Sequence, residues 1–416
     1  MKNIFIINQR SRAMSYGVGT YTQQLISALQ LLSVRITVVT LSADLFDLEI
    51  SERDGVRYIM IPVPASERYI RFFSKKDDER YLRNVYYMLL PYIPKNESVV
   101  FHFNFQELGG VAYLLKEHFM CKIVTTMHYS HWSFNLLGDR EKLYSILKQD
   151  SHESQENKTR ELFFMEQKFY REIADYIISI SKHSYDDLIN IYGISSSKII
   201  LIPNGIKDEY RKINDDGKRE LRKYFYLEED EKLLLFVGRV TPIKGIDYLL
   251  KAFKDILKIR KDVRLMIIGE SSEEDLRYYQ SLTYPFYSKI SFNGFVSKEK
   301  LADIYSITDL GIVSSIHEEF GYVAIEMLMH GIPIIANKTT GLKDIIQDGI
   351  NGSCFQIQKN DESASISELT AKIIDLLDDP EKRIRYIQKG REYFCRKYDL
   401  SVFSQHIKDF YLQINS

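Results

Sequence analysis

The chain has 416 residues and a formal net charge of −1, with 45% hydrophobic and 27% charged residues. The length favours two domains over one, and a net charge near zero argues against a general nucleic-acid-binding protein. Three cysteines in so long a chain fit a reducing compartment and form no metal-binding pattern. The first apolar run, Ile4–Ile7, is too short for a signal peptide, and no later stretch has the apolar length that spans a bilayer, so we expect a cytoplasmic protein.

Short apolar runs alternate with helical patterns through the first half of the chain. This order predicts a parallel sheet with helices on both faces. Helices are predicted between several strands, among them Val18–Leu31 and Thr159–Ala174. The predicted strands are Ile4–Ile7, Ile36–Thr40, Arg57–Ile61, Val99–Phe103, Ile123–Met127, Tyr176–Ser179 and Ile199–Ile202.

A turn at Pro203-Asn204-Gly205 and a charged segment from Lys207 to Lys232 mark the boundary between two domains. A second alternating series follows, with a helical pattern after Gly245 and another from Val402 to Leu412. We therefore expect an α/β protein with two doubly wound, Rossmann-like domains that face each other across a cleft, with ligands beyond the carboxyl ends of the strands. The strands predicted in the second series are Leu233–Val237, Leu265–Ile268, Ile290–Phe292, Leu310–Val313 and Ile332–Ala336.

Gly17-Val18-Gly19 precedes a helix that is predicted to begin near Thr20. Glycines let a backbone approach a ligand closely, and a helix start favours negative charge. A dinucleotide fingerprint would need a third glycine and a strand immediately before it, whereas Thr22 stands at the third position and a polar segment intervenes. A ligand-facing loop and a simple flexible loop remain the two alternatives.

His128 follows the predicted strand Ile123–Met127 in the sequence TTMHYSHWS. A histidine at the carboxyl end of a strand can donate a hydrogen bond to a sugar hydroxyl or a carbonyl. His131 is a competitor, and a lone histidine is often only paired locally. Neither histidine has the neighbouring carboxylates or cysteines of a metal site at suitable spacing.

Arg239 and Lys244 bracket one loop, since Phe236-Val237-Gly238-Arg239 ends a predicted strand and Pro242-Ile243-Lys244-Gly245 opens the next helix. Two cations aimed at one point repel each other unless an anion joins them. A diphosphate supplies that anion, because Arg binds it in a fork and Lys binds it as a point charge. A pair of solvated surface cations is the alternative.

The segment His317 to Pro333, HEEFGYVAIEMLMHGIP, places Glu318 and Glu326 eight positions apart around a Phe-Gly pair. The apolar run after Gly321 predicts a helix, with Glu318 just ahead of its first turn and Glu326 about one turn in. A carboxylate among apolar neighbours costs free energy unless it is hydrogen-bonded, so we expect a polar partner for Glu326. The N–H groups at the helix start could hold a diphosphate. Alternatively, Glu318 is only a helix-start acid and Glu326 lies on a solvated edge.

This segment resembles the E-x-F-G-x(4)-E signature of retaining, nucleotide-sugar-dependent glycosyltransferases of the family 4 type (glycosyltransferases group 1), which have the GT-B fold. The resemblance is best from Ile199 to Gly352. In the N-terminal half it rests on the glycine loop and on Thr126-Met127-His128, which matches the family's Thr-x-His and favours His128 over His131.

The resemblance also implies how the domains are divided. In GT-B proteins the last helix crosses back onto the N-terminal domain. The expected N-terminal, acceptor-side domain is therefore residues 1–205 with a C-terminal helix at about 398–416, and the expected nucleotide-sugar-binding domain is residues 206–397.

The chemistry implied by the resemblance is transfer of a hexose from a UDP- or GDP-sugar to a hydroxyl of a glycan or lipid-linked saccharide. Glu318 would contact the donor sugar, Glu326 the ribose hydroxyls and His128 the donor hexose, and Arg239 and Lys244 would stabilise the departing diphosphate. The other donor-binding positions implied are Gly17, Gly19, Gly238, Gly294, Phe295, Val296, Phe320, Gly321, Tyr322 and Val323.

Three details of this picture have alternatives. The chain has no Asp-x-Asp motif, and protein cations can neutralise a leaving group, so we expect neither a metal ion nor a cofactor. The side chain of Phe295 would fit a hydrophobic core equally well. Thr339-Thr340-Gly341 resembles the family's glycine-rich turn, which could contact phosphate or simply form a turn.

Two other functions remain open. A nucleotide-sugar epimerase on the same fold would convert the donor without an acceptor, and a non-catalytic glycan- or nucleotide-binding protein would bind without turnover. Separately, the segment Arg68–Ile93 mixes basic and aromatic residues and could dock on the inner face of an anionic membrane, which would suit a lipid-linked acceptor. Its acidic residues Asp77, Asp78 and Glu79 favour a solvated surface segment instead.

Overall fold

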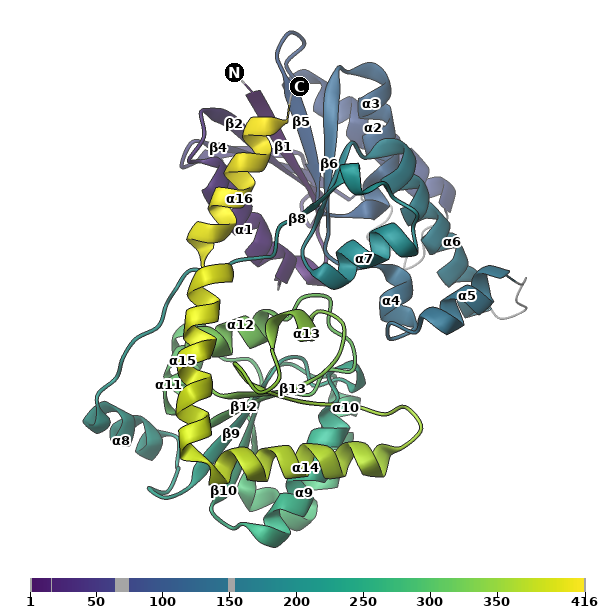
Figure 1. Cartoon of the computed structure of the whole chain (residues 1–416). Coiled ribbons are helices and arrows are strands. Elements are labelled where there is room, and N and C mark those ends of the chain that lie inside the picture. Colours follow the sequence, from purple (N-terminus) through teal and green to yellow (C-terminus); the bar gives the residue numbers. More distant parts are fainter. Residues whose placement is uncertain (1, 16, 64–74, 149–153, 415–416) are drawn as a thin grey trace. The chain divides into compact units, whose positions relative to one another are not determined.

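A computed structural model describes residues 2–15, 17–63, 75–148 and 154–414. The chain divides into two compact units, Met1–Gly205 with Leu400–Ser416 and Ile206–Asp399. Each unit is built on one sheet that is parallel or nearly so, with helices packed against it (Figure 1). The two doubly wound α/β sheets predicted from the alternation of strands and helices are therefore confirmed.

The sheet of the first unit has eight strands in the order β3-β4-β2-β1-β5-β6-β7-β8. All neighbours are parallel except β3 and β4, which pair antiparallel at one edge. β3 is missing from the predicted strands because its sequence, EISER, has no apolar alternation and every residue is exposed. The bounds are β1 (Lys2–Gln9), β2 (Val34–Ala43), β3 (Glu49–Arg53), β4 (Val56–Pro62), β5 (Val99–Phe103), β6 (Cys121–Met127), β7 (Tyr176–Ser179) and β8 (Ile199–Leu201).

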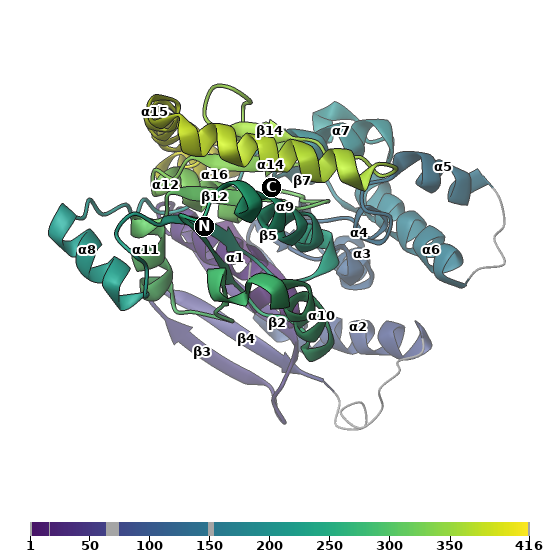
Figure 2. The same cartoon turned by 90° about the horizontal axis from the view of Figure 1, so that it is seen from below.

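Alternate residues of β1 enter the two hydrophobic cores of the first unit. Ile4 and Ile6 pack in the core that contains residues of α1 and α16, and Phe5 and Ile7 pack in the core that contains residues of α2 and α3. α1 and α16 pack side by side, as both views show (Figures 1 and 2). The helix bounds are α1 (Gly17–Leu29), α2 (Lys75–Leu89), α3 (Gly109–His118), α4 (His131–Asn135), α5 (Arg140–Lys148), α6 (Ser154–Lys168), α7 (Lys182–Asn190) and α16 (Leu400–Gln413).

The segment considered for membrane contact is only partly described, since residues 64–74 lie outside the described ranges. In α2, Tyr86 and Leu89 are buried in the core, whereas Tyr87 and Met88 are 61% and 41% exposed. Of the five apolar side chains at positions 85–89, which end this helix, three are therefore buried in the core of the unit. None of the helices in the described ranges combines the length and the apolar character needed to cross a bilayer.

The sheet of the second unit has six parallel strands in the order β11-β10-β9-β12-β13-β14. The strand order reverses between β9 and β12, and ligands bind at such a switch point, beyond the carboxyl ends of the strands. β14 is missing from the predicted strands because its sequence, SCF, has no β-branched residue, unlike the equally short β8 and β11. The bounds are β9 (Lys232–Val237), β10 (Val263–Ile268), β11 (Ile290–Phe292), β12 (Leu310–Val313), β13 (Ile334–Asn337) and β14 (Ser353–Phe355).

Eight helices surround this sheet within the described residues of the second unit. α9 and α14 pack side by side (Figures 1 and 2), and the apolar face predicted after Gly245 is buried there. The charged segment Lys207–Lys232 contains a helix of its own, α8, which packs against α11 and belongs to the second unit. The helix bounds are α8 (Asp215–Tyr224), α9 (Ile246–Ile259), α10 (Glu273–Thr283), α11 (Lys298–Ile307), α12 (Tyr322–Met329), α13 (Leu342–Ile345), α14 (Glu362–Asp378) and α15 (Pro380–Lys397).

Candidate active site

The loop after β9 is held against the segment after β12, at the switch point of the second sheet. Ser314 Oγ donates a hydrogen bond of 2.9 Å to the carbonyl of Lys244, and Ile316 N donates to the carbonyl of Ile243 at 2.8 Å. Gly245 ends the loop with φ +65°, and a Cβ there would lie 2.0 Å from the carbonyl oxygen of Ser314. Only glycine fits this position without moving the backbone.

This packing brings Lys244 to Glu318. Lys244 Nζ lies 2.5 Å from Glu318 Oε2, and both side chains are 19% exposed. Ser315 Oγ donates to the same carboxylate oxygen at 3.1 Å. The site therefore holds a cation and an anion that are paired, partly buried and still accessible to a ligand.

Arg239 lies in the same loop, directly after Gly238. Within the described ranges its guanidinium makes no hydrogen bond or ion pair. Gly238 has φ +145°, and a Cβ on Gly269 would lie 1.8 Å from the Gly238 carbonyl oxygen, so two glycine backbones touch at the ends of β9 and β10. Arg239 thus projects from a fixed backbone and is partly exposed.

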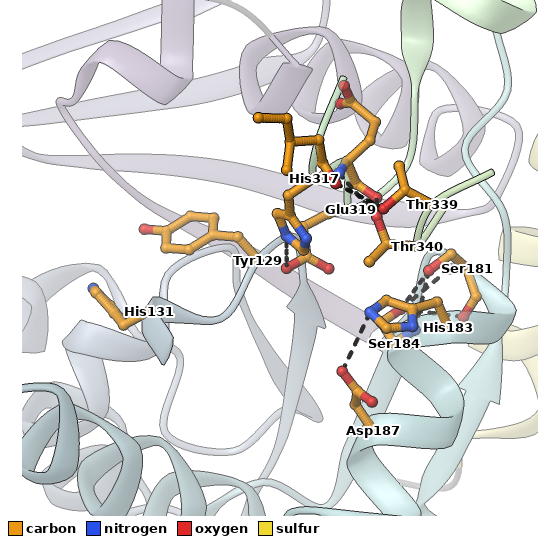
Figure 3. A network of polar contacts seen from close by, with 12 residues as sticks. Tyr129, His131, Ser181, His183, Ser184, Asp187, His317, Glu319, Thr339 and Thr340 are labelled. Atoms are coloured by element: carbon orange, nitrogen blue, oxygen red, sulfur yellow. Dashed lines mark hydrogen bonds and ion pairs between the residues drawn. The ribbon is translucent and has the colours of Figure 1, made fainter. Parts of the chain in front are cut away.

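Two threonines fix the backbone of the acidic segment. Thr340 Oγ1 accepts a hydrogen bond from Glu318 N at 2.9 Å and donates one to the Glu318 carbonyl at 2.5 Å. Thr339 Oγ1 donates to the Ile316 carbonyl at 2.8 Å. Both hydroxyls therefore bond to the protein backbone, as the turn interpretation of Thr339-Thr340-Gly341 requires. His317 Nε2 lies 3.2 Å from Glu319 Oε1 in the same segment (Figure 3).

α12 begins directly after Gly321, which has φ +110°. Because glycine has no side chain, no side-chain group at this position caps the first N–H groups of the helix. A Cβ on Gly321 would lie 2.8 Å from Leu342 Cδ2, so α12 and α13 approach closely here. The N–H groups of Tyr322 and Val323 belong to the first turn, which favours negative charge. Phe320, before the glycine, is buried and packs edge-to-face on Tyr322 with ring centres 5.2 Å apart.

Glu326 has the polar partner that its apolar surroundings required. Tyr305 Oη, on α11, donates a hydrogen bond of 2.9 Å to Glu326 Oε2. Burial raises the pKa of Glu326, and the Tyr305 hydrogen bond opposes that rise. Within the described ranges, no hydrogen bond or ion pair joins Glu326 to Arg239, Lys244 or Glu318.

The loop between β11 and α11 contains Gly294, Phe295 and Val296. Gly294 has φ +61°, and its carbonyl accepts a hydrogen bond of 2.8 Å from Gly269 N. Phe295 is 72% exposed, so the core interpretation of its side chain is wrong. The loop backbone is held at the same edge of the sheet as Gly238.

His128 lies at the carboxyl end of β6, in the first unit. Its Nε2 lies 3.2 Å from Asn104 Oδ1, and its ring packs edge-to-face on Tyr21 with ring centres 4.6 Å apart. Burial lowers its pKa to about 3, so the imidazole is neutral at physiological pH. A neutral His128 can donate one hydrogen bond and accept one. It has no positive charge with which to attract a phosphate.

His131 is paired locally. Its Nε2 lies 2.9 Å from Glu107 Oε1 and its Nδ1 lies 2.7 Å from Glu166 Oε1. Burial lowers its pKa, but the hydrogen bonds and charges of the two carboxylates outweigh burial and raise the pKa to about 10. Glu166 is fully buried and also accepts hydrogen bonds from Gln106 and Tyr192. Sequence reasoning missed these two glutamates because no local pattern links them to His131.

The glycines of the first loop lie inside α1, because this helix begins at Gly17 and not near Thr20. A Cβ on Gly19 would lie 2.0 Å from the Met14 carbonyl oxygen. Gly19 therefore lets the short helix Arg12–Ser15 pack against α1. Farther along, Ser181 and Ser184 form a capping box at the start of α7 (Figure 3).

The described ranges contain no group of three His, Cys, Asp or Glu side chains that could hold a metal ion. Of the predicted residues, the structure joins Lys244 to Glu318 and places Arg239, Gly238, Gly294 and the start of α12 at the carboxyl edge of the same sheet. Glu326 bonds to Tyr305 instead. His128, Gly17 and Gly19 belong to the first unit.

Two family models match the chain. The model described as Glycosyltransferase Family 4 matches residues 16–210, and the model described as Glycosyl transferases group 1 matches residues 217–393. Together they leave only the two ends and a short stretch around residues 211–216 unmatched.

Curated relatives match over part of their length. An uncharacterised glycosyltransferase of Methanocaldococcus jannaschii is 33% identical over 180 residues, which are 42% of this chain and 45% of that protein. A lipopolysaccharide 1,2-N-acetylglucosaminetransferase of Salmonella typhimurium is 27% identical over 52% of this chain and 57% of that protein. The chain thus spans about half the length of the curated relatives it matches.

Solved structures match over nearly the whole chain. A sucrose-phosphate synthase from Thermosynechococcus elongatus has a TM-score of 0.76 and 22% identity, covering 99% of both chains. The Anabaena protein HepE, solved in complex with UDP, has a TM-score of 0.73 and 15% identity, covering 99% of this chain and 100% of that one. At these identities the likeness concerns the fold.

Proposed function

We propose a reaction for this chain, which belongs to glycosyltransferase family 4 and has the GT-B fold: it transfers a hexosyl group from a nucleoside-diphosphate sugar to a hydroxyl of a glycan or lipid-linked saccharide. The observation that carries the proposal is the contact between Lys244 and Glu318 at the switch point of the second sheet. Arg239 lies in the same loop as Lys244, and its guanidinium has no partner among the residues that the structure describes. The two cations, Arg239 and Lys244, suit the anionic diphosphate end of a nucleotide sugar. The carboxylate of Glu318, at the same edge of the sheet, suits the hydroxyls of the sugar at the other end.

Uracil is the first base to test. HepE was solved with UDP and with UDP-glucose, and its fold is like that of this chain. GDP-sugars are the second choice. The backbone of Gly294, Phe295 and Val296 would pair with the base, because backbone donors and acceptors can read a base edge whatever the side chains are.

In this proposal Lys244 and Arg239 bind the diphosphate. Lys has three N–H donors, so Lys244 can keep its bond to Glu318 and still donate to a phosphate oxygen. Arg239, which has no partner within the described part of the chain, can bind a second phosphate oxygen. The N–H groups at Gly321, Tyr322 and Val323 add positive potential at the start of α12. No metal ion is required for the leaving group, because these groups neutralise the charge that develops on it.

The remaining residues bind the two sugars. Glu318 accepts a hydrogen bond from a hydroxyl of the donor hexose, and Glu326 accepts from the ribose. For the first unit, the family resemblance assigns Gly17 and Gly19 to the phosphates and the acceptor, and neutral His128 to the hexose. These assignments combine the family resemblance with the contacts described above.

The chemical step exchanges one bond for another at the anomeric carbon. The bond from this carbon to the diphosphate oxygen breaks, and a bond to the acceptor oxygen forms on the same face of the sugar. The acceptor proton passes to a phosphate oxygen of the departing diphosphate. The configuration is therefore retained without a carboxylate nucleophile.

The test is incubation with UDP-, GDP- and ADP-sugars, with and without oligosaccharide and glycolipid acceptors, followed by mass spectrometry and nuclear magnetic resonance of the product. We expect an α-configured product from an α-configured donor, formed only with an acceptor. If the donor is isomerised in the absence of an acceptor, the protein is an epimerase. Nucleotide binding without any turnover would show a non-catalytic binding protein.

A further inference from the structure

Tyr305 is a buried residue that no sequence motif singled out. It lies on α11 and is 3% exposed. Its hydroxyl donates the 2.9 Å hydrogen bond to Glu326 Oε2, and no other side chain in the described ranges bonds to this carboxylate. The ring of His330, which follows α12, stacks on the ring of Tyr305 with centres 4.8 Å apart and planes inclined by 29°. Tyr305 is thus held from one side and bonded to Glu326 on the other.

The bond controls both the orientation and the charge of the carboxylate. A glutamate side chain has three rotatable bonds, and a donor fixed by packing removes much of that freedom. Around Glu326, burial and the charge of Glu209 favour the protonated form, whereas Tyr305 and Lys298 favour the carboxylate. Tyr305 provides the only hydrogen bond among these influences. A carboxylate has about four acceptor positions, so one bond to Tyr305 leaves room for a diol.

We propose that Tyr305 is a positioning residue, which holds Glu326 as an oriented acceptor for the 2′- and 3′-hydroxyls of the nucleotide ribose. The stacked His330 limits the movement of the Tyr305 ring. This inference rests on the proposed function, because it requires Glu326 to contact the ribose. It adds a residue outside the E-x-F-G-x(4)-E segment to the machinery that selects ribonucleotides.

The variant Tyr305→Phe keeps the ring and its stacking on His330 and removes only the hydroxyl. The measurement is isothermal titration of wild type and variant with UDP and with 2′-deoxy-UDP. We expect the wild type to bind UDP more tightly than the deoxynucleotide. We expect Tyr305→Phe to weaken UDP binding about tenfold, in line with loss of one hydrogen bond to a charged group. Binding of 2′-deoxy-UDP changes much less, so the ratio of the two affinities falls.

Tyr386→Phe is the matched control. Tyr386 is 1% exposed in the same unit, and its hydroxyl lies 3.3 Å from Ser353 Oγ. Its loss should leave the affinity ratio at the wild-type value. Equal weakening of both nucleotides by Tyr305→Phe, or an unchanged ratio, would overturn the inference, since a merely structural role would not distinguish ribose from deoxyribose.

Glu326→Gln separates this inference from the proposed function. If Glu326→Gln reduces the affinity ratio and Tyr305→Phe does not, the positioning role of Tyr305 is wrong and the ribose contact of Glu326 stands. If Glu326→Gln also leaves the ratio unchanged, the ribose contact is wrong and the inference fails with it. If the base proves to be guanine or adenine, the same comparison is made with GDP and 2′-deoxy-GDP or with ADP and 2′-deoxy-ADP. Failure of UDP, GDP and ADP alike to bind would overturn both.

Discussion

Lys244 Nζ and Glu318 Oε2 lie 2.5 Å apart, although 74 positions separate the two residues in the chain. The contact forms because Gly245 and Ser314 bring the loop after β9 against the segment after β12. Both residues are only partly buried, so the pair is accessible to a ligand. A partly buried ion pair loses much of its Coulombic gain to desolvation and so contributes little net stability, which makes a role in ligand binding the better reason for this arrangement.

Lys244→Ala should lower kcat about 10²–10³-fold, the usual effect of removing one group that stabilises charge in a transition state. Glu318→Ala should lower turnover strongly as well, because the donor hexose loses a hydrogen-bond acceptor. The measurement is the rate of product formation with a confirmed donor, together with circular dichroism and thermal unfolding.

Lys251→Ala is the matched control for Lys244→Ala. Lys251 Nζ lies 2.6 Å from Glu362 Oε1 on the exposed surface of the same unit. Its loss should leave turnover unchanged and cost at most about 1 kcal/mol of stability. Wild-type rates in either active-site variant would contradict the role given to that residue.

Gly245→Ala should destabilise the second unit and reduce turnover together, because a Cβ would meet the Ser314 carbonyl oxygen at 2.0 Å and push the Lys244 loop away from Glu318. Gly349→Ala is the control. Gly349 has φ +76°, and its Cβ would meet no atom within 4 Å. The control should show only the backbone cost of about 1–2 kcal/mol with normal turnover. Equal losses of unfolding free energy in the two variants would show that the close approach to Ser314 is unimportant.

The parts of the fold that follow from local pattern could be predicted from the sequence. Buried parallel strands such as β9 and β12 consist almost wholly of apolar residues, and their prediction needs no distant information. β3 and β14 could not be predicted, because β3 is wholly exposed and β14, with the sequence SCF, has no β-branched residue. The sequence predicts the start of α1 near Thr20, whereas the helix begins at Gly17, because glycine has a low helix propensity.

The candidate site could be predicted only as far as its motifs extend. The loop bearing Arg239 and Lys244 and the segment bearing Glu318 were recognisable from local sequence, and chain topology brings them to one edge. Tyr305 was not recognisable, because one buried tyrosine on an amphipathic helix looks like any other core residue. Its importance depends on the register of α11 against α12, which tertiary packing decides.

His131 should give the first unit a pH-dependent stability. Its pKa of about 10 in the folded protein lies above the usual value of 6.5. Pairing with Glu107 and Glu166 therefore stabilises the fold fully below pH 6.5, and this contribution is lost as the pH rises through about 10. The difference in unfolding free energy between wild type and His131→Gln should be largest near pH 6 and should shrink towards pH 10.

Unfolding of the first unit can be followed by fluorescence, because Trp132 is the only tryptophan of the chain and is fully buried there. His118→Gln serves as the control, since the His118 side chain is 50% exposed. Its loss should change the unfolding free energy of the first unit much less than the loss of His131. If the difference in unfolding free energy between wild type and His131→Gln stays constant from pH 6 to pH 10, charged pairing of His131 with Glu107 and Glu166 is ruled out.

Glu326 should make binding of UDP-glucose weaken in acid. Burial raises its pKa, so the carboxylate becomes protonated at a higher pH than an ordinary glutamate and loses acceptor capacity for the ribose. Affinity should be greatest above this raised pKa and fall as the pH drops through it. Glu326→Gln should bind more weakly at neutral pH and show a flatter profile. Parallel profiles for the two proteins would exclude Glu326 from the pH response.

A double-mutant cycle on Lys244 and Glu318 tests the central claim that these two residues act together on one activated-sugar donor. The measurement is kcat/KM of the donor for wild type, Lys244→Ala, Glu318→Ala and the double variant. If the two side chains serve the same ligand as a unit, the double variant loses little more activity than the worse single variant. A double variant whose loss equals the product of the two single losses, or single variants with wild-type activity, would contradict the claim.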